Sequence, residues 1–328
     1  MSPITIPQTI AGNGGFERWR HFLPREQSRL AYASLLGLAL LAGSAFALLP
    51  VVHNWSELGP VWAGLAALLV MGRYLERDHS HVIGGLLEMI GMFFLLSMMG
   101  SLTGSVLATT ALPTVDAALA GIDAAIGFEW LPTFRAWQEV DGVFAALSIV
   151  YSSLSWQPVV LLGLLTVGGH HAAAWRFLAA WGISLLITML VFPFFPAHAN
   201  FIVNGIDPAE VPGIMVPSGW SFAASFDGLR DGSILLIGRD ELDGLVTFPS
   251  FHTSAGILLA AGFAPLGRIA WPLCLLNAAM VVSAVFIGAH YLVDILAGIA
   301  IALLGLWVAE FRVPTGETKT EQDFGPKP

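Results

Sequence analysis

Hydrophobic runs occupy most of this chain, and polar residues gather in the stretches between them. Eight runs are candidates for membrane-spanning helices, because about 20 predominantly apolar residues cross a hydrocarbon core of ~30 Å. They cover residues 30–52, 58–72, 82–111, 142–169, 177–196, 250–264, 269–288 and 290–309. The second run is short for a full crossing and needs Arg73 and Arg77 to extend toward the headgroups. The pattern predicts an all-α polytopic membrane protein with about eight transmembrane helices.

The polar segments predict where the membrane domain begins and ends. Residues 1–29 form an N-terminal segment, residues 30–311 the membrane domain and residues 312–328 a polar tail. The first apolar run is long and lacks a small-residue cleavage site, which favours a retained span over a signal peptide. The longest connection inside the membrane domain runs from the end of the fifth span to about residue 246.

Basic residues are distributed unequally between the two sides of this eight-span arrangement. If the N-terminus is cytoplasmic, only Arg135, Arg230 and Arg239 fall outside the cell. The cytoplasmic set is Arg18, Arg20, Arg25, Arg29, Arg73, Arg77, Arg176, Arg268, Arg312, Lys319 and Lys327. Because an excess of Lys and Arg marks the cytoplasmic side, we expect both termini to be cytoplasmic. The same count places His252, His290 and Asp294 at the extracytoplasmic face.

Residues 112–141 carry acids and tryptophans among small apolar residues. Asp116 and Asp123 are seven residues apart and therefore share one helix face. Trp130 and Trp137 are residue types that favour the headgroup level of a membrane. We expect a short helix in the outer interface, which serves either as a structural flap or as a cover for an active site.

Composition agrees with a membrane protein and excludes several other classes. The chain is 56% hydrophobic and only 11% charged, with a mean hydropathy of +0.75. Its net charge of −9 and its lack of a basic cluster exclude nucleic acid as a partner. The single cysteine, Cys274, excludes an intramolecular disulfide. No Cys/His spacing typical of a metal site occurs, so we expect neither a metal nor a cofactor.

Polar residues at the ends of the last three spans are the main candidates for chemistry. His252 opens one span, and His290 and Asp294 open another. Ionisable residues inside spans are functional candidates because an Asp near a helix centre costs about 2.5–3.5 kcal/mol on insertion scales. His290 and Asp294 are four residues apart, so the carboxylate can orient the imidazole for nucleophilic or base chemistry.

Two motifs around these residues resemble those of a known family. Phe248-Pro249-Ser250-Phe251-His252-Thr253 and Gly288-Ala289-His290-Tyr291-Leu292-Val293-Asp294 resemble the second and third signatures of the type 2 phosphatidic acid phosphatase superfamily. The branch with inositol phosphorylceramide synthases and their bacterial relatives is the most similar. The resemblance is sharpest over residues 229–298, is fainter over residues 112–158, and implies a phosphatase or phosphotransferase core at about residues 142–311.

The resemblance implies a role for each motif residue. His290 would attack phosphorus to form a phosphohistidine, Asp294 would fix its tautomer, and His252 would protonate the leaving oxygen. Ser250 would offer its hydroxyl and backbone N–H to phosphate oxygens at a helix N-terminus, which suits an anion. Tyr151 and Gln157 resemble the family's fourth-span pattern and would face the site.

The sequence also departs from the family pattern at its cationic positions. The first signature, a Lys six residues before an Arg-Pro pair, is absent, and Ala284 stands where the third signature has Arg. A transferring phosphoryl group needs cationic or dipolar support. Arg230 and Arg239 are the candidates on the expected side, ahead of Arg135.

We therefore expect a membrane lipid phosphotransferase that resembles inositol phosphorylceramide synthases. Its donor would be a phospholipid or sphingolipid and its acceptor a polyol or lipid alcohol. Trp220, Phe222 and Phe226 of the long connection could exclude bulk water from the intermediate. A lipid phosphatase acting on phosphatidate-type or polyprenyl phosphates is the alternative, and a proton-coupled transporter is a remote one. Two further polar residues lie inside the spans: Glu88 either lines a proton or substrate path or is a structural carboxyl, and Asn277 is expected to bond between helices.

Overall fold

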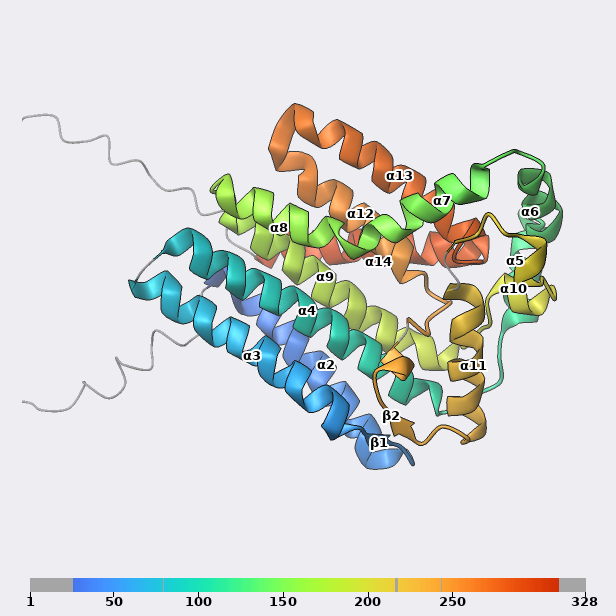
Figure 1. Cartoon of the computed structure of the whole chain (residues 1–328), viewed down its shortest axis with the longest axis horizontal. Helices are drawn as coiled ribbons and strands as arrows, with labels where there is room; N and C mark the ends of the chain where they lie inside the picture. The colour runs from blue at the N-terminus through green and yellow to red at the C-terminus, as the bar shows by residue number, and fades with distance from the viewer. Residues whose placement is uncertain (1–25, 79, 216–217, 243, 313–328) are drawn as a thin grey trace, which may run out of the picture.

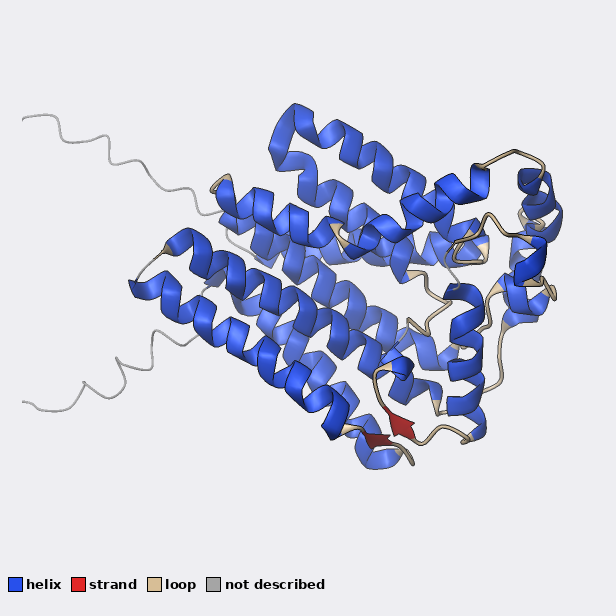
Figure 2. Cartoon of the chain, viewed as in Figure 1, coloured by secondary structure: helices blue, strands red, loops and turns tan. Residues whose placement is uncertain are grey.

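Nearly all of the secondary structure in the described part of the chain is helical (Figure 2). We used a computed structural model, which describes residues 26–78, 80–215, 218–242 and 244–312. Residues 1–25 of the expected N-terminal segment and residues 313–328 of the expected tail lie outside this part. So do Arg18, Arg20, Arg25, Lys319 and Lys327, on which part of the orientation argument depends.

Long helices form a bundle and shorter ones gather at one of its ends (Figure 1). The α-helices are α2 Arg29–Leu48, α3 Trp55–Asp78, α4 His81–Ala108, α5 Asp116–Ala125, α6 Trp130–Gln138, α7 Val143–Ser152, α8 Gln157–Val167, α9 His171–Val191, α10 Asn200–Val203, α11 Ser218–Asp231, α12 Phe251–Phe263, α13 Ala270–Phe286 and α14 Leu292–Arg312. The 3-10 turns are η1 Glu26–Ser28, η2 Ser153–Ser155, η3 Phe192–Phe194, η4 Pro208–Glu210, η5 Asp240–Leu242 and η6 Ala264–Ile269.

Five helical segments among the described residues are long and apolar enough to cross a membrane. They are Glu26–Leu48, Trp55–Glu76, His81–Ala108, His171–Phe194 and Leu292–Phe311. A sixth crossing results if α7 and α8, which meet at a bend of 51°, form one broken span. The helix α12 has 13 residues and α13 has 17, so each is short for a full crossing. The all-helical membrane fold is thus confirmed, whereas the count of eight spans stays a prediction.

The second span is longer than its apolar run predicts. Helix α3 continues through Arg73 because this side chain points inward, where its Nε lies 2.8 Å from Oε1 of Glu88 on α4. The hydroxyl of Tyr32 also donates to Glu88, at 2.8 Å. Glu88 is 2% exposed, and its two partners favour the structural interpretation of this carboxyl over a proton path.

The apolar run at residues 142–169 is not one straight helix. It breaks at η2 between α7 and α8, where Pro158 begins the second helix. The Gln157 amide donates to Oγ of Ser153 and accepts from Nδ2 of Asn277 on α13, each at 2.8 Å. The prediction that Asn277 bonds between helices is thus confirmed, and this buried contact holds the break against α13.

Residues 112–141 form two helices, α5 and α6, rather than one, and their position in the outer interface stays a prediction. Trp130 is 5% exposed, and its Nε1–H donates to the carbonyl of Val285 at 2.9 Å. Trp137 stacks on Phe286, with ring centroids 4.6 Å apart. Both tryptophans pack on the end of α13, where Trp130 is buried with its N–H satisfied.

The long connection after α9 is also structured. It contains α10 and α11, and its strand β2 (Leu236–Ile237) pairs in parallel with β1 (Val52–His53) after α2. In Figure 1, α5, α6, α10 and α11 lie together beside the bundle end where α12 begins and α13 turns into α14. We call these four helices the cap.

The opposite end of the bundle holds the described ends of the chain (Figure 1). Arg176, near the start of α9, forms an ion pair of 2.7 Å with Glu310, near the end of α14. The start of α2 lies at the same end of the bundle as the start of α9. The cap therefore covers the bundle end away from Glu26 and Arg312.

Candidate active site

The start of α12 is fixed by its own N-cap and by α14. Ser250 is fully buried, and its Oγ accepts from the backbone N–H of Thr253 at 3.3 Å. The backbone N–H of Ser250 donates to the carbonyl of Asp294 at 3.2 Å. Gly298 permits this approach of the two helices, since a Cβ there would lie 2.4 Å from the Ser250 carbonyl oxygen. The two motifs are therefore in direct contact.

The turn between α13 and α14 brings His290 next to Asp294. Ala289 adopts a left-handed conformation with φ of 51°, and its carbonyl accepts from the Asn200 N–H at 2.8 Å. Oδ2 of Asp294 accepts from the Tyr291 N–H at 2.9 Å and lies 3.3 Å from Nδ1 of His290. Asp294 is fully buried and His290 is 5% exposed. The carboxylate thus lies behind the imidazole, on the side of Nδ1.

His252, in the first turn of α12, packs against a tyrosine from another helix. Its ring stacks on that of Tyr151 from α7, with centroids 4.1 Å apart and planes 10° apart. The Tyr151 hydroxyl lies 3.3 Å from Nδ1 of His252. This contact fixes the orientation of the ring and directs its Nε2 away from the tyrosine hydroxyl.

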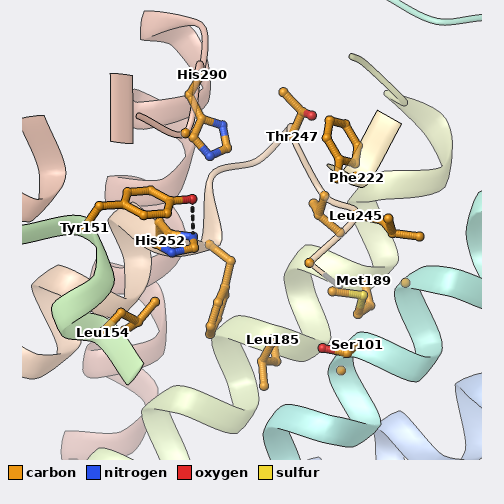
Figure 3. Close-up of a pocket in the computed structure, with 16 residues that line it drawn as sticks. Ser101, Tyr151, Leu154, Leu185, Met189, Phe222, Leu245, Thr247, His252 and His290 are labelled. Atoms are coloured by element: carbon orange, nitrogen blue, oxygen red, sulfur yellow. Dashed lines mark hydrogen bonds between the residues drawn. The ribbon is translucent and has the colours of Figure 1, made fainter. Parts of the chain in front are cut away.

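His252, His290 and Tyr151 line one cavity of about 210 Å³ (Figure 3). In the close-up these three side chains form one wall, and Phe222, Leu245 and Met189 lie across from them. Ser101 and Thr247 are the other hydroxyl side chains of the lining. The remaining lining residues are Gly100, Gly104, Leu154, Leu185, Gly244, Val246, Phe251 and Gly288. The cavity therefore offers two imidazoles in a mainly apolar enclosure.

Two of the predicted phosphate-contacting residues do not line this cavity. The N–H and hydroxyl of Ser250 are already bonded to Asp294 and Thr253, so this residue orders the helix start. Gln157 is fully buried in its contacts with Ser153 and Asn277. Of the predicted fourth-span pair, only Tyr151 reaches the cavity.

The predicted arginines lie elsewhere as well, and no described Lys or Arg lines the cavity. Nη2 of Arg230 donates to the carbonyl of Leu112 at 2.6 Å, and its guanidinium carbon lies 4.9 Å from the centre of the Phe226 ring. Burial lowers the pKa of Arg230. These contacts tie α11 to the connection after α4.

The other two arginines expected on the outer side also lie outside the cavity lining. Arg239 is exposed, and its backbone N–H donates to Oε2 of Glu57 at 3.0 Å, beside the start of α3. Arg135 forms an exposed ion pair of 2.9 Å with Glu210. Among the described residues, the polar side chains that line the cavity are therefore imidazoles and hydroxyls.

Sequence reasoning missed a network of acids and a histidine behind the turn between α13 and α14. Asp116 and Asp123 of α5 accept hydrogen bonds from residues 291–293, and His198 bridges Asp116 to Asp227 of α11. The only sequence signal was the spacing of the two acids on one helix face. Nothing in the sequence connected them to a turn about 170 residues further along.

Fold and cavity together define a helical membrane protein with a pair of histidines, one of them backed by a carboxylate, at one end of its bundle. Among the described residues, no group of three or more His, Cys, Asp or Glu side chains could hold a metal ion. The family model of the PAP2 superfamily matches residues 117–308, more than half of the chain, so the chain belongs to this superfamily. Members are typically phosphatases or phosphotransferases, which supports a lipid phosphatase or phosphotransferase type of function. Comparison with curated proteins gave no match, and comparison with solved structures gave none either.

Proposed function

We propose that this protein is a membrane-embedded lipid phosphotransferase that acts through a phosphohistidine at His290. It moves a phosphoryl group or a phospho-headgroup from a lipid donor to an alcohol acceptor, as inositol phosphorylceramide synthases do. The observation that carries the proposal is that His252 and His290 line one cavity, with Asp294 behind His290. This arrangement supplies a nucleophile, an acid and an orienting carboxylate.

In the first step, the contact with Asp294 keeps a proton on Nδ1 of His290 and leaves the lone pair on Nε2. Nε2 attacks phosphorus, so a P–N bond forms as the bond to the lipid oxygen breaks. His252 gives its proton to that oxygen, which leaves as an alcohol. Asp294 stabilises the positive charge that His290 acquires.

In the second step, the hydroxyl of an acceptor attacks the same phosphorus. His252, now neutral, takes the acceptor's proton as the P–O bond forms and the P–N bond breaks. His290 regains its starting form, and no group is consumed. Water in place of the alcohol would give hydrolysis by the same route.

The lining of the cavity favours a phosphodiester donor over a phosphomonoester. A monoester carries up to two negative charges, and none of the described Lys or Arg side chains lines the cavity. A diester carries one, which the His252 imidazolium and the N–H groups at the start of α12 can balance. This argument supports transfer of a phospho-headgroup.

The lining of the cavity also supports an alcohol acceptor. Its far wall is apolar and includes Phe222 of the cap, whereas Trp220 and Phe226, also expected to exclude water, are not among the lining residues. Positioning an acceptor beside a covalent intermediate is worth a large effective concentration. We infer that a polyol or lipid alcohol captures the intermediate faster than water.

A trapping and partition experiment tests the proposal. Purified protein is incubated with phospholipids ³²P-labelled in the headgroup phosphate, and acid-labile, base-stable label on protein is measured together with product as acceptor is added. Wild type should carry the label and pass it to acceptor, whereas His290→Ala should carry none and His252→Ala should be slowed most with poor leaving groups. His170→Ala, which removes an exposed imidazole at the other end of the bundle, is the matched control.

Two outcomes would change the assignment. A folded His290→Ala protein that keeps more than a few per cent of the wild-type rate would remove His290 as the nucleophile. Products that stay hydrolytic at every acceptor, with an unchanged rate, would make lipid phosphatase the better description.

A further inference from the structure

We propose that Asp123 and Asp116 of α5 are positioning residues that hold the turn between α13 and α14 in its reactive geometry. This inference rests on the proposed function of His290 and Asp294. It assigns α5 a role other than that of a flap or cover, because its two carboxylates point into the protein at that turn.

Asp123 caps α14 from a distant helix. It is 2% exposed, and its Oδ2 accepts from the Leu292 N–H at 2.7 Å while its Oδ1 accepts from the Val293 N–H at 2.9 Å. The first N–H groups of a helix have no acceptor within the helix, so an outside carboxylate fixes both their position and the helix start. Such charge-assisted bonds are among the stronger ones in proteins.

Two carboxylates therefore divide the N–H groups of this turn between them. Asp294 accepts from Tyr291, and Asp123 accepts from the next two residues. His290 directly precedes the residues so bound. A shift of the turn would move its imidazole relative to the carboxylate of Asp294 and relative to the cavity.

Asp116 binds the side chain of Tyr291 in the same turn. The hydroxyl of Tyr291, itself 1% exposed, donates to Oδ1 of Asp116 at 3.1 Å. The same Oδ1 accepts from the backbone N–H of His198 at 2.8 Å. The ring of His198 continues the network, since its Nε2 lies 2.9 Å from Oδ1 of Asp227. Asp227 belongs to α11, which also supplies Phe222 to the cavity wall. The network thus joins the catalytic turn to the opposite wall.

The geometry at His290 leaves little tolerance for movement. Its Nδ1 lies 3.3 Å from Oδ2 of Asp294, near the long limit for such a bond. A small displacement would break the contact that keeps the proton on Nδ1. Because misplacement of reacting groups by about 1 Å can cost on the order of 10²-fold in rate, the support behind this turn matters for catalysis.

The test compares Asp123→Asn with Asp231→Asn. Asn keeps the shape of Asp123 but has one acceptor oxygen instead of two, so one N–H of α14 loses its partner. Asp231 accepts the Ser233 N–H at 2.8 Å in the same way, but on an exposed turn of the cap, which makes it a matched control. We expect kcat to fall by about 10²-fold in Asp123→Asn with KM changed less than about twofold, and neither to change in Asp231→Asn.

A second readout needs no substrate. In protein with ¹⁵N-labelled histidine, the His290 signals, assigned by their loss in His290→Ala, should show the Nδ1–H tautomer in wild type and in Asp231→Asn. Asp123→Asn should show a mixture of tautomers. If Asp123→Asn does not fold, Tyr291→Phe tests the inference instead, because it removes only the hydroxyl that donates a hydrogen bond to Asp116. This variant should lower kcat by about three- to tenfold.

Unchanged kcat and an unchanged His290 spectrum in folded Asp123→Asn or Tyr291→Phe would overturn the inference. A loss of activity that merely follows the fraction of folded protein would do the same. If wild type transfers no label to protein or acceptor while the His290 tautomer still responds to Asp123→Asn, the proposed function fails and the positioning role stands.

Discussion

At the scale of single residues, His198 joins two carboxylates of the cap, one on α5 and one on α11. Its Nδ1 lies 3.5 Å from Oδ2 of Asp116, and its Nε2 faces Asp227. The hydrogen bond with Asp116 raises the pKa of His198, with a further contribution from Asp227, although burial opposes it. Burial likewise opposes ionisation of Asp116, but hydrogen bonds from His198, Thr114 and Tyr291 outweigh it and lower its pKa. Both shifts favour a charged pair.

We predict that the stability gap between wild type and His198→Gln depends on pH. The contribution of His198 is fully present below its unfolded pKa of about 6.5 and is lost as pH rises through its raised folded value. The contribution of Asp116 is present above about pH 4 and is lost as pH falls through its lowered folded value. Thermal unfolding in detergent should show the largest gap between about pH 4 and 6.5 and a smaller one at pH 9. A gap that is constant over this range would rule out the charged pair.

The contact of His290 with Asp294 could be predicted from their spacing on a helix face, but in the structure His290 precedes α14 and the turn at Ala289 brings the two together. The stacking of Tyr151 on His252 could not be predicted, since these residues are 101 positions apart and belong to different helices. The motif resemblance suggested that Tyr151 and Gln157 would face the site together. Only Tyr151 does, because the break at η2 turns Gln157 toward Asn277.

At the scale of helices, the site depends on a close crossing of α12 and α14. Gly298 faces the start of α12, where an added Cβ would lie 2.4 Å from the Ser250 carbonyl oxygen and 3.0 Å from Cβ of Thr253. The first of these neighbours is backbone, which cannot rotate away. A side chain at this position must therefore push apart the two helices that carry His252 and Asp294.

We predict that Gly298→Ala destabilises the protein by about 1–3 kcal/mol, the usual cost of overpacking, and lowers kcat beyond the loss of folded protein. Gly163→Ala in α8 is the matched control, since nothing lies within 4 Å of an added Cβ there. It should be neutral or stabilising by up to about 1 kcal/mol, as alanine favours a helix over glycine. The measurement is the thermal stability and kcat of Gly298→Ala and Gly163→Ala. If both quantities are the same in the two variants, the crossing of α12 and α14 tolerates a larger residue.

Apolar runs predicted where most long helices lie but not how they end. The apolar run at residues 58–72 ends at Arg73, because a charged residue marks a boundary in hydropathy. In the structure, the pairing of Arg73 with Glu88 lets α3 continue to Asp78. The run at residues 142–169 contains no charge and therefore predicts one span, although residues 152–158 within it are mostly polar or helix-breaking and the helix breaks there at η2. Such features depend on partners in other helices, which a single run of residues does not reveal.

At the scale of the whole molecule, the cap and the described chain ends lie at opposite ends of the bundle (Figure 1). Of the three arginines expected on the outer side, Arg135 and Arg230 belong to cap helices and Arg239 follows β2. Arg176 and Arg268 lie at the other end, near the start of α9 and in η6. The positive-inside rule then supports our proposal that both termini are cytoplasmic and that the cavity opens on the extracytoplasmic side.

Cysteine labelling tests this orientation and the number of spans together. In a Cys274→Ala background, which lacks the single native thiol, we introduce Asp231→Cys in the cap, Arg268→Cys in η6 and Lys319→Cys in the C-terminal tail. A membrane-impermeant thiol reagent should label the Asp231→Cys protein in intact cells. It should label the other two only after the membrane is permeabilised, because eight crossings place both positions in the cytoplasm. The reverse pattern would invert the orientation. If the Arg268→Cys protein stays unlabelled after permeabilisation, the short helices α12 and α13 form a hairpin that ends inside the membrane, and the prediction of eight spans is wrong.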